Sequence, residues 1–216
     1  MIDIASQIAA IHREVGRKPL ADGEGISLVL RRIYGAPIDD VWSALTEPDR
    51  IKRWFFPVSG DLRAGGIFQL EGNAGGEILR CEPPQLLTVT FGGETSVVQV
   101  RLSSDGEDAT VLDFEHTVPI EMAGSGAGAL YVGPGWDGGL LALDLYLGGE
   151  ISEDPIAAAN SPEAQEFSRQ SVMTWASVVA ASDTATDDEI SAAADVSLKQ
   201  FAPDLPDPRN PESSDA

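Results

Sequence analysis

The stretch RRIYGAPIDDVWSALTEPDRIKRWFFPVSGDLRAGGIFQLEGNAGGEILRCEPPQLLTVTF, residues 31–91, decides the fold. It begins inside an alternating, β-branched segment that predicts a strand over residues 26–34. Ala36-Pro37 then puts proline at a first helical position, and two aspartates follow in the first turn, where they favour the helix dipole. A helix is therefore expected here, and a second short helix is expected to start at Pro48.

The pattern changes period after residue 61. Runs of five to ten residues alternate with Gly-Gly, Pro-Pro or Asp-Gly, which is typical of a meander of antiparallel strands. The expected strands are IFQLEG (67–72), GEILRC (76–81), LLTVTF (86–91), SVVQVRL (96–102) and ATVLDFEHTV (109–118). A glycine-rich loop over 119–135 follows. Trp136, Leu140 and Leu143 then have the spacing of one helical face, which predicts a helix over 136–147.

Outside this region the chain predicts further helices. Ile4, Ile8, Ile11 and Val15 form one helical stripe, so residues 1–24 are expected to be a helix and a linker. Residues 149–201 are expected to be a helical extension containing two helices, the second of which begins with a capping box. The last fifteen residues, 202–216, contain four prolines and four acids and are expected to be disordered.

This order of elements predicts an α+β architecture. A strongly curved antiparallel sheet cannot leave its concave face exposed to water, and the long helix at 136–147 is the natural cover. The space between that helix and the sheet is then expected to be a pocket.

These residues resemble the START-like, helix-grip superfamily (also called SRPBCC), and within it proteins similar to the activator of the heat-shock-protein-90 ATPase. The resemblance covers residues 25–148 and implies a helix-grip domain there, with extra helices at both ends. It implies little about function, because one fold of this kind serves carriers, cyclases and co-chaperones. The matching residues are Ala36, Pro37, Val41, Trp42, Trp54, Phe55, Gly65, Gly66, Pro83, Pro84, Gly135 and Trp136.

Composition excludes several classes of protein. The formal net charge is −21, and the whole imbalance lies in residues 61–216, because residues 1–60 carry eight basic and eight acidic side chains. Such a surface repels phosphate backbones and anionic membranes, so no nucleic-acid or membrane partner is expected. No apolar run reaches the length of a membrane helix, and residues 1–18 do not resemble a signal peptide. With a single cysteine, Cys81, the sequence favours a cytoplasmic protein.

Motifs for common chemistry are absent from the sequence. There is no phosphate-binding loop and no Gly-x-Ser-x-Gly elbow. His12 and His116 lack metal-site spacing, so neither a metal nor a cofactor is expected. Glu71 and Glu77 flank a hairpin and are interpreted as solvated. Asp137 and Asp144 lie on the helix face opposite the leucines and are also expected to face solvent.

His116 is the one candidate catalytic residue. Alternation along its strand places it on the same face as Leu112 and Phe114, at or near the inner wall of the pocket. It could act there as a general base, hydrogen-bond a ligand, or be a structural histidine. The residues expected to bind a ligand are Trp54, Phe68, Leu70, Val98, Val100, Leu112, Phe114, His116, Tyr131, Trp136, Leu140 and Leu143.

Three functions remain open. We rank first the binding of a hydrophobic or amphipathic small molecule between the sheet and the helix. A cyclase- or hydratase-type enzyme acting on a polyketide-like substrate comes second, because it needs several convergent polar groups and the sequence offers only His116. A co-chaperone or regulatory module that docks another protein comes third. The sequence does not determine the oligomeric state.

Overall fold

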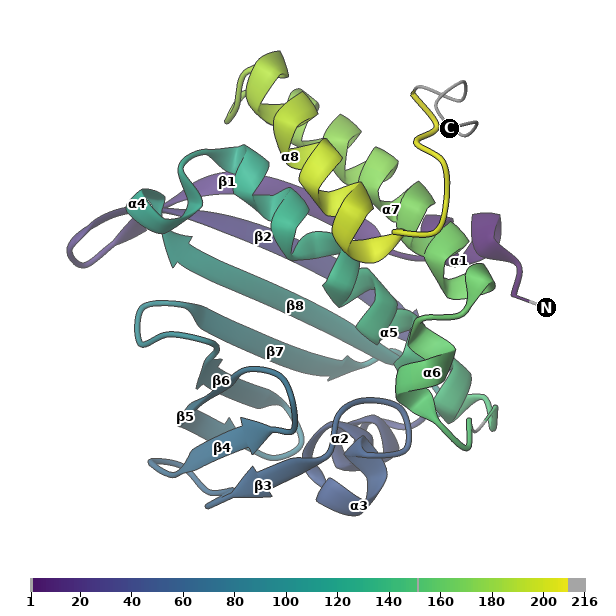
Figure 1. The fold of residues 1–216 in the computed structure, drawn as a ribbon. Coiled ribbons are helices and arrows are strands. Elements are labelled where there is room, and N and C mark those ends of the chain that lie inside the picture. Colours follow the sequence, from purple (N-terminus) through teal and green to yellow (C-terminus); the bar gives the residue numbers. More distant parts are fainter. Residues whose placement is uncertain (1, 151, 210–216) are drawn as a thin grey trace.

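The computed structural model describes residues 2–150 and 152–209, and its centre is one curved antiparallel sheet (Figure 1). The strand order is β1-β2-β8-β7-β6-β5-β4-β3. Every described neighbouring pair in this order is antiparallel. The strands are β1 (His12–Leu20), β2 (Gly23–Tyr34), β3 (Val58–Gly60), β4 (Ile67–Leu70), β5 (Gly75–Glu82), β6 (Leu86–Thr90), β7 (Val97–Ser104) and β8 (Thr110–Pro119). The predicted meander is confirmed.

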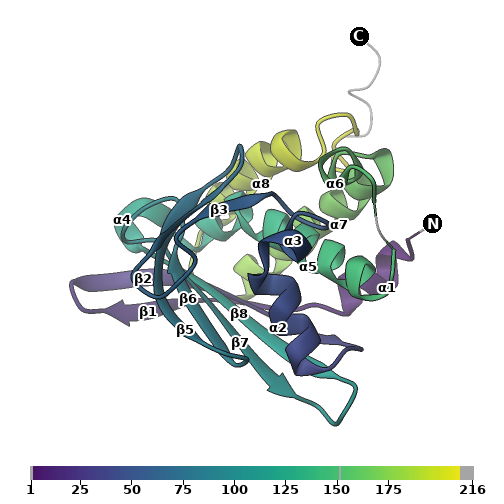
Figure 2. The same ribbon diagram turned by 90° about the horizontal axis from the view of Figure 1, so that it is seen from below.

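Helices cover the concave face of this sheet. The sheet curves around α5, and α2 and α3 lie beside it (Figure 2). This is the helix-grip arrangement that the sequence predicts. The helices are α1 (Ile4–Ala9), α2 (Ile38–Thr46), α3 (Pro48–Ile51), α4 (Ile120–Ala123), the 3-10 helix η1 (Gly126–Tyr131), α5 (Gly133–Leu147), α6 (Pro155–Ala159), α7 (Pro162–Ala181) and α8 (Asp187–Phe201). None of those in the described residues is both long and apolar enough to cross a membrane.

The N-terminal segment differs from its prediction. Helix α1 ends at Ala9, so the prediction of one helix through Val15 is wrong. Residues 12–20 instead form β1, which pairs with β2 along its whole length and turns back at Gly23. The apolar stripe was ambiguous, because Ile11 and Val15 also fit alternate positions of a strand. Pairing with β2 satisfies the backbone groups of this segment and decides in favour of the strand.

The predicted helices of the extension are confirmed as α7 and α8. Thr186 and Glu189 form the expected capping box at the start of α8. Helix α7 packs closely on α5 at Gly133, where an added Cβ would lie 2.6 Å from the ring of Trp175. Only glycine allows this approach. The glycine-rich segment 119–135 is more regular than expected, since it contains α4 and η1.

The C-terminal tail is described as far as residue 209. Gln165 donates a hydrogen bond to the Asp204 carboxylate at 2.8 Å, and Arg209 pairs with Asp195 on α8. Residues 202–209 therefore contact the extension, which differs from the expected disorder. Residues 210–216 lie outside the described part of the chain. The division at residues 24, 148 and 201 stays a prediction, although β1 joins the same sheet as the rest.

Candidate ligand-binding cavity

A cavity of about 200 Å³ lies between the concave face of the sheet, α2, α3 and α5. It is open to solvent near Leu62, which is 38% exposed. Its wall is almost entirely apolar. The lining residues are Leu45, Thr46, Ile51, Trp54, Phe55, Val58, Leu62, Phe68, Leu70, Ile78, Cys81, Leu87, Val89, Phe91, Val98, Val100, Leu112, Phe114, Trp136, Gly139, Leu140 and Leu143.

Strand alternation builds the sheet side of the wall. On β7 and β8, alternate residues point to the concave face, and cross-strand pairing sets Val100 opposite Phe114. Val98 and Leu112 extend the same apolar surface along these two strands. The wall residues predicted on these strands therefore lie together because the register of the sheet brings them together.

Helix α5 closes the other side. Trp136, Leu140 and Leu143 recur at the spacing of one helical face, and this face lines the cavity. Tyr34 is fully buried on β2 and donates its hydroxyl to the carbonyl of Leu140 at 3.1 Å, which fixes the helix over the sheet. The indole of Trp136 also packs on Phe114, with ring centroids 4.5 Å apart.

The structure places ten of the twelve predicted ligand-binding residues in the cavity wall and two outside it. Tyr131 lies on η1 and is 44% exposed. His116 points to the concave face, as expected, but lies behind Trp136 and does not line the cavity. None of the described lining residues comes from the glycine-rich segment 119–135.

His116 has both ring nitrogens engaged. The indole Nε1–H of Trp136 donates to Nδ1 at 3.1 Å, so Nδ1 must be the acceptor. In the neutral ring Nε2 then carries the proton and donates to Ser96 Oγ at 2.8 Å. Burial lowers the pKa of His116 to about 4. The residue is therefore neutral at pH 7 and holds Trp136 in place, and it has no free nitrogen to act as a base.

Several wall residues were missed by sequence reasoning. Phe55 lines the cavity and lies against α5, because a Cβ added at Gly139 would be 3.8 Å from its ring. It stacks on Trp54, whose indole donates to the Ala44 carbonyl at 3.0 Å. The signal was present in the Trp-Phe-Phe run after α3, but a run of aromatic residues alone does not show which rings face a cavity.

The polar groups of the wall are few. Thr46 donates its hydroxyl to the Trp42 carbonyl at 2.8 Å. The thiol of Cys81 is a further polar group of the wall, and burial raises its pKa. No carboxylate, histidine, lysine or arginine is among the described lining residues. Within the described chain, no three His, Cys, Asp or Glu side chains gather in a way that could hold a metal ion. The arrangement is suited to binding apolar groups rather than to proton transfer.

Asp137 corrects a second expectation, because it is fully buried rather than facing solvent. Its Oδ2 accepts hydrogen bonds from Arg13 at 2.9 Å, from Trp175 at 3.1 Å and from Ser171. Burial raises the pKa of Asp137, and the Arg13 guanidinium opposes that rise. Asp144 is partly buried and pairs with Arg32 at 2.6 Å. The face of α5 opposite the leucines is thus covered by β1 and α7.

The two glutamates at the hairpin do not face each other. Glu77 lies on β5 opposite Ile67, whereas Glu71 follows the end of β4. Both are exposed, as expected.

Comparison with known proteins agrees with this geometry. A family model described as "Activator of Hsp90 ATPase homolog 1-like protein" matches residues 35–148, from the start of α2 to the end of α5. The chain belongs to this family. The match spans the whole wall of the cavity, and the START-like assignment made from the sequence is confirmed. The match does not cover β1, β2, α7 or α8.

Two solved structures are similar over most of the chain. The crystal structure of CalU16 from Micromonospora echinospora is 42% identical, with a TM-score of 0.65, over 79% of this chain and 98% of that chain. EF2215, a conserved protein of unknown function from Enterococcus faecalis, is 18% identical, with a TM-score of 0.57, over 81% of this chain and 95% of that chain. The second likeness shows the fold alone. No curated protein matches the sequence.

Proposed function

We propose that this member of the family binds a hydrophobic or amphipathic small molecule in the cavity between the sheet and α5. The observation that carries the proposal is the wall itself, which combines an opening to solvent with an almost wholly apolar lining. An apolar cavity of about 150 Å³ is enough to hold benzene, so this one accommodates at least an aromatic ring or a short branched chain. A longer ligand would extend through the mouth beside Leu62 and Phe55.

The enzyme alternative is less well supported. A cyclase or hydratase needs polar groups that converge on the substrate, and the only histidine near the cavity is engaged by Trp136 and Ser96. The docking alternative has the family description in its favour, but no surface among the residues that the structure describes identifies a partner. We therefore propose a carrier or receptor without catalysis, located in the cytoplasm and with no affinity for nucleic acid.

The proposal is tested by filling the cavity. Leu140→Trp adds bulk inside the wall and is expected to abolish binding of an apolar fluorescent probe such as anilinonaphthalene sulfonate, with only modest loss of stability. In a solid core the same change overpacks and costs about 1–3 kcal/mol. Leu145→Trp is the matched control, because Leu145 lies on the same helix but outside the wall. Wild-type protein that binds no probe, or Leu140→Trp protein that binds it unchanged, contradicts the proposal.

The ligand itself is sought by native mass spectrometry of the purified protein. A co-purifying molecule with an apolar moiety that is absent from the Leu140→Trp variant supports the cavity as its site. A ligand that persists in that variant binds elsewhere.

A further inference from the structure

Gly139 is the only glycine among the described residues that line the apolar cavity. It lies near the middle of α5, and its φ is outside the left-handed region, so the backbone does not require a glycine there. A Cβ added at this position would meet only the ring of Phe55, at an ordinary contact distance of 3.8 Å. Packing therefore does not require a glycine either.

Glycine in the interior of a helix nevertheless has a cost. It destabilises the folded protein relative to alanine, because it loses more conformational freedom on folding. Natural proteins accept such local costs chiefly at functional sites. At Gly139 the missing side chain leaves space, so that the backbone of α5 itself lines the cavity beside Phe55.

The preceding residue, Gly138, differs from Gly139 in one respect that matters. An added Cβ at Gly138 meets nothing within 4 Å, and Gly138 does not line the cavity. The two glycines share a helix and a cost in stability. Only Gly139 bounds the space available to a ligand.

Aromatic rings surround this space. Phe55 is stacked on Trp54, with ring centroids 5.3 Å apart and planes at 30°. On α5, Trp136 lies about one turn before the glycine and packs against Phe114 at 4.5 Å and Phe91 at 4.9 Å. All of these rings line the cavity. Such rings bind another ring more strongly than buried area alone predicts, through edge-to-face and offset contacts.

Hydrogen bonds contribute little to the selection of a ligand here. The indole N–H groups of Trp54 and Trp136 and the hydroxyl of Thr46 already donate within the protein. No charged side chain is among the described lining residues. Shape and ring contacts therefore select what enters.

We propose that Gly139 is the specificity-determining residue of the cavity, and that the space it leaves beside Phe55 and Trp136 admits a flat aromatic ring of the ligand. The inference rests on the function proposed above, because it requires that the cavity bind a small molecule. A ring in this place contacts the bare backbone of α5, and any side chain at position 139 displaces it.

Substitutions at position 139 test the space by fluorescence titration of the full chain with N-phenylnaphthylamine, an uncharged aromatic probe. Gly139→Ala is expected to weaken binding about fourfold, the contribution of one buried carbon, and Gly139→Leu about a hundredfold or more. Gly139→Ala is also expected to raise the melting temperature, because alanine favours a helix. A more stable protein that binds less is an outcome that a merely structural role of Gly139 does not produce.

Gly138→Ala and Gly138→Leu are the matched controls, and both are expected to bind the probe like wild type. Gly139→Leu protein that binds the probe as tightly as wild type overturns the inference. Equal losses in Gly138→Leu and Gly139→Leu also overturn it, because the effect then comes from the helix and not from the cavity.

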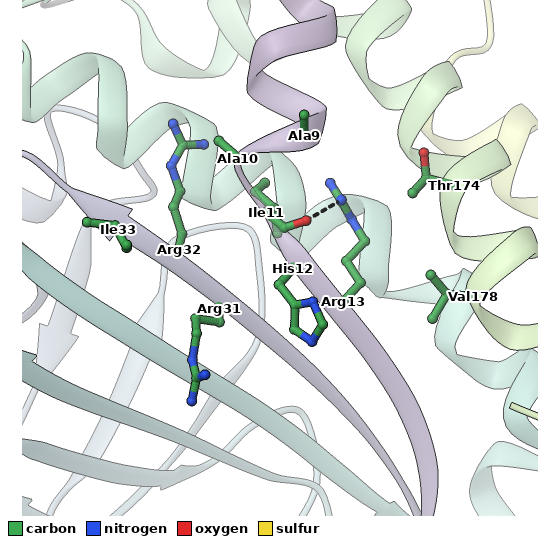
Figure 3. A pocket seen from close by; sticks show the side chains of 10 residues that line it. All are labelled: Ala9, Ala10, Ile11, His12, Arg13, Arg31, Arg32, Ile33, Thr174 and Val178. Atoms are coloured by element: carbon green, nitrogen blue, oxygen red, sulfur yellow. Dashed lines mark hydrogen bonds between the residues drawn. The ribbon is translucent and has the colours of Figure 1, made fainter. Parts of the chain in front are cut away.

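A second hollow in the molecule requires a control of its own. It encloses about 400 Å³ at the corner where α1 meets β1, and it shares no lining residue with the apolar cavity. Figure 3 shows its lining side chains, with Thr174 and Val178 of α7 on one side. Thr174→Trp fills this hollow and is expected to leave probe binding unchanged. Loss of binding in Thr174→Trp but not in Gly139→Leu places the probe there and contradicts the inference.

The class of ligand is tested by displacing the probe with toluene and with methylcyclohexane, which have the same number of carbons. Each affinity is divided by the partition coefficient of the molecule from water into hexadecane, because the saturated ring is the more hydrophobic. After this correction toluene is expected to bind about threefold more tightly or better. Equal corrected affinities would mean that the cavity does not select a flat ring.

The outcomes distinguish this inference from the function on which it rests. Wild-type protein that binds no probe refutes the proposed function and this inference together. Loss of binding in Leu140→Trp with no change in Gly139→Leu supports the cavity as the binding site and refutes the role of Gly139 alone.

Discussion

Trp136 donates the hydrogen of its indole Nε1 to Nδ1 of His116 at 3.1 Å, and this bond joins a wall residue of the cavity to a buried histidine behind it. The bond fixes the histidine tautomer and directs its other nitrogen to Ser96. It requires the ring to be neutral, because a protonated imidazole has no acceptor. The position of one face of the cavity is thus linked to a titratable group.

The first prediction concerns the stability of the folded protein at acid pH. The pKa of His116 is about 4 in the folded protein and 6.5 in the unfolded chain. Between these values the unfolded chain binds a proton that the folded protein does not, so stability falls as the pH decreases from 6.5 to 4. The full loss at this one site is roughly 3 kcal/mol.

The test compares wild type with His116→Gln by denaturant unfolding at pH 7, 5.5 and 4, so that the difference between the two proteins reports on this histidine alone. The stability advantage of wild type is expected to shrink over this range. A constant difference between the two proteins would show that His116 does not resist protonation. Probe binding measured over the same range should weaken as Trp136 loses its acceptor.

The second prediction concerns the buried pair of Arg13 and Asp137. Asp137→Ala leaves a buried guanidinium without its carboxylate and removes the acceptor of Trp175 and Ser171. A loss of about 3–5 kcal/mol is expected from this change, measured as a shift in the denaturation midpoint. Asp113→Ala on β8 is the control, because it also removes the carboxylate of an arginine pair. Its partner Arg31 is 59% exposed, so a much smaller loss is expected. Similar losses in the two variants would refute the argument.

This pair also shows where sequence reasoning stopped. Periodicity placed Asp137 correctly on the face of α5 opposite Leu140 and Leu143, but it treated that face as solvent because a helical wheel contains no information about neighbouring elements. The covering residues, Arg13 and Trp175, lie 124 and 38 residues away in the sequence. Long-range packing of this kind has no local signal.

The cavity wall was more predictable than its chemistry. Strand alternation and helical spacing identified nine wall residues, because those periods decide which side of an element each residue occupies. The same rule put His116 on the correct face. It could not show that Trp136 lies between His116 and the cavity, because that depends on how α5 sits over β8. The prediction of a helix through Val15 was wrong for a related reason. Pairing with β2 decides that residues 12–20 form a strand, and this pairing depends on a distant part of the chain.

The third prediction uses two glycines of α5. An added Cβ on Gly138 meets nothing within 4 Å, so Gly138→Ala removes the entropic cost of glycine in a helix and is expected to stabilise the protein by about 0.5–1 kcal/mol. Gly133→Ala makes the same change where the ring of Trp175 lies 2.6 Å from the new atom, and a loss of about 1–3 kcal/mol is expected. Thermal unfolding of both variants is the measurement. If Gly133→Ala is also stabilising, α5 and α7 are not in the close contact described.

The last prediction uses Cys81 as a reporter of the cavity. Cys81 lines the wall and is the only cysteine in the chain, so any reaction with a thiol reagent reports on this site alone. Burial raises its pKa, which leaves less thiolate at neutral pH than a free cysteine has. Reaction with an aromatic disulfide reagent is therefore expected to be slower in the folded protein than in denaturant, with a pH midpoint above the usual value.

A bound apolar probe should slow the reaction of Cys81 further in proportion to occupancy, and Leu140→Trp should slow it without any probe. A rate that does not change at saturating probe would mean that the probe binds outside this cavity.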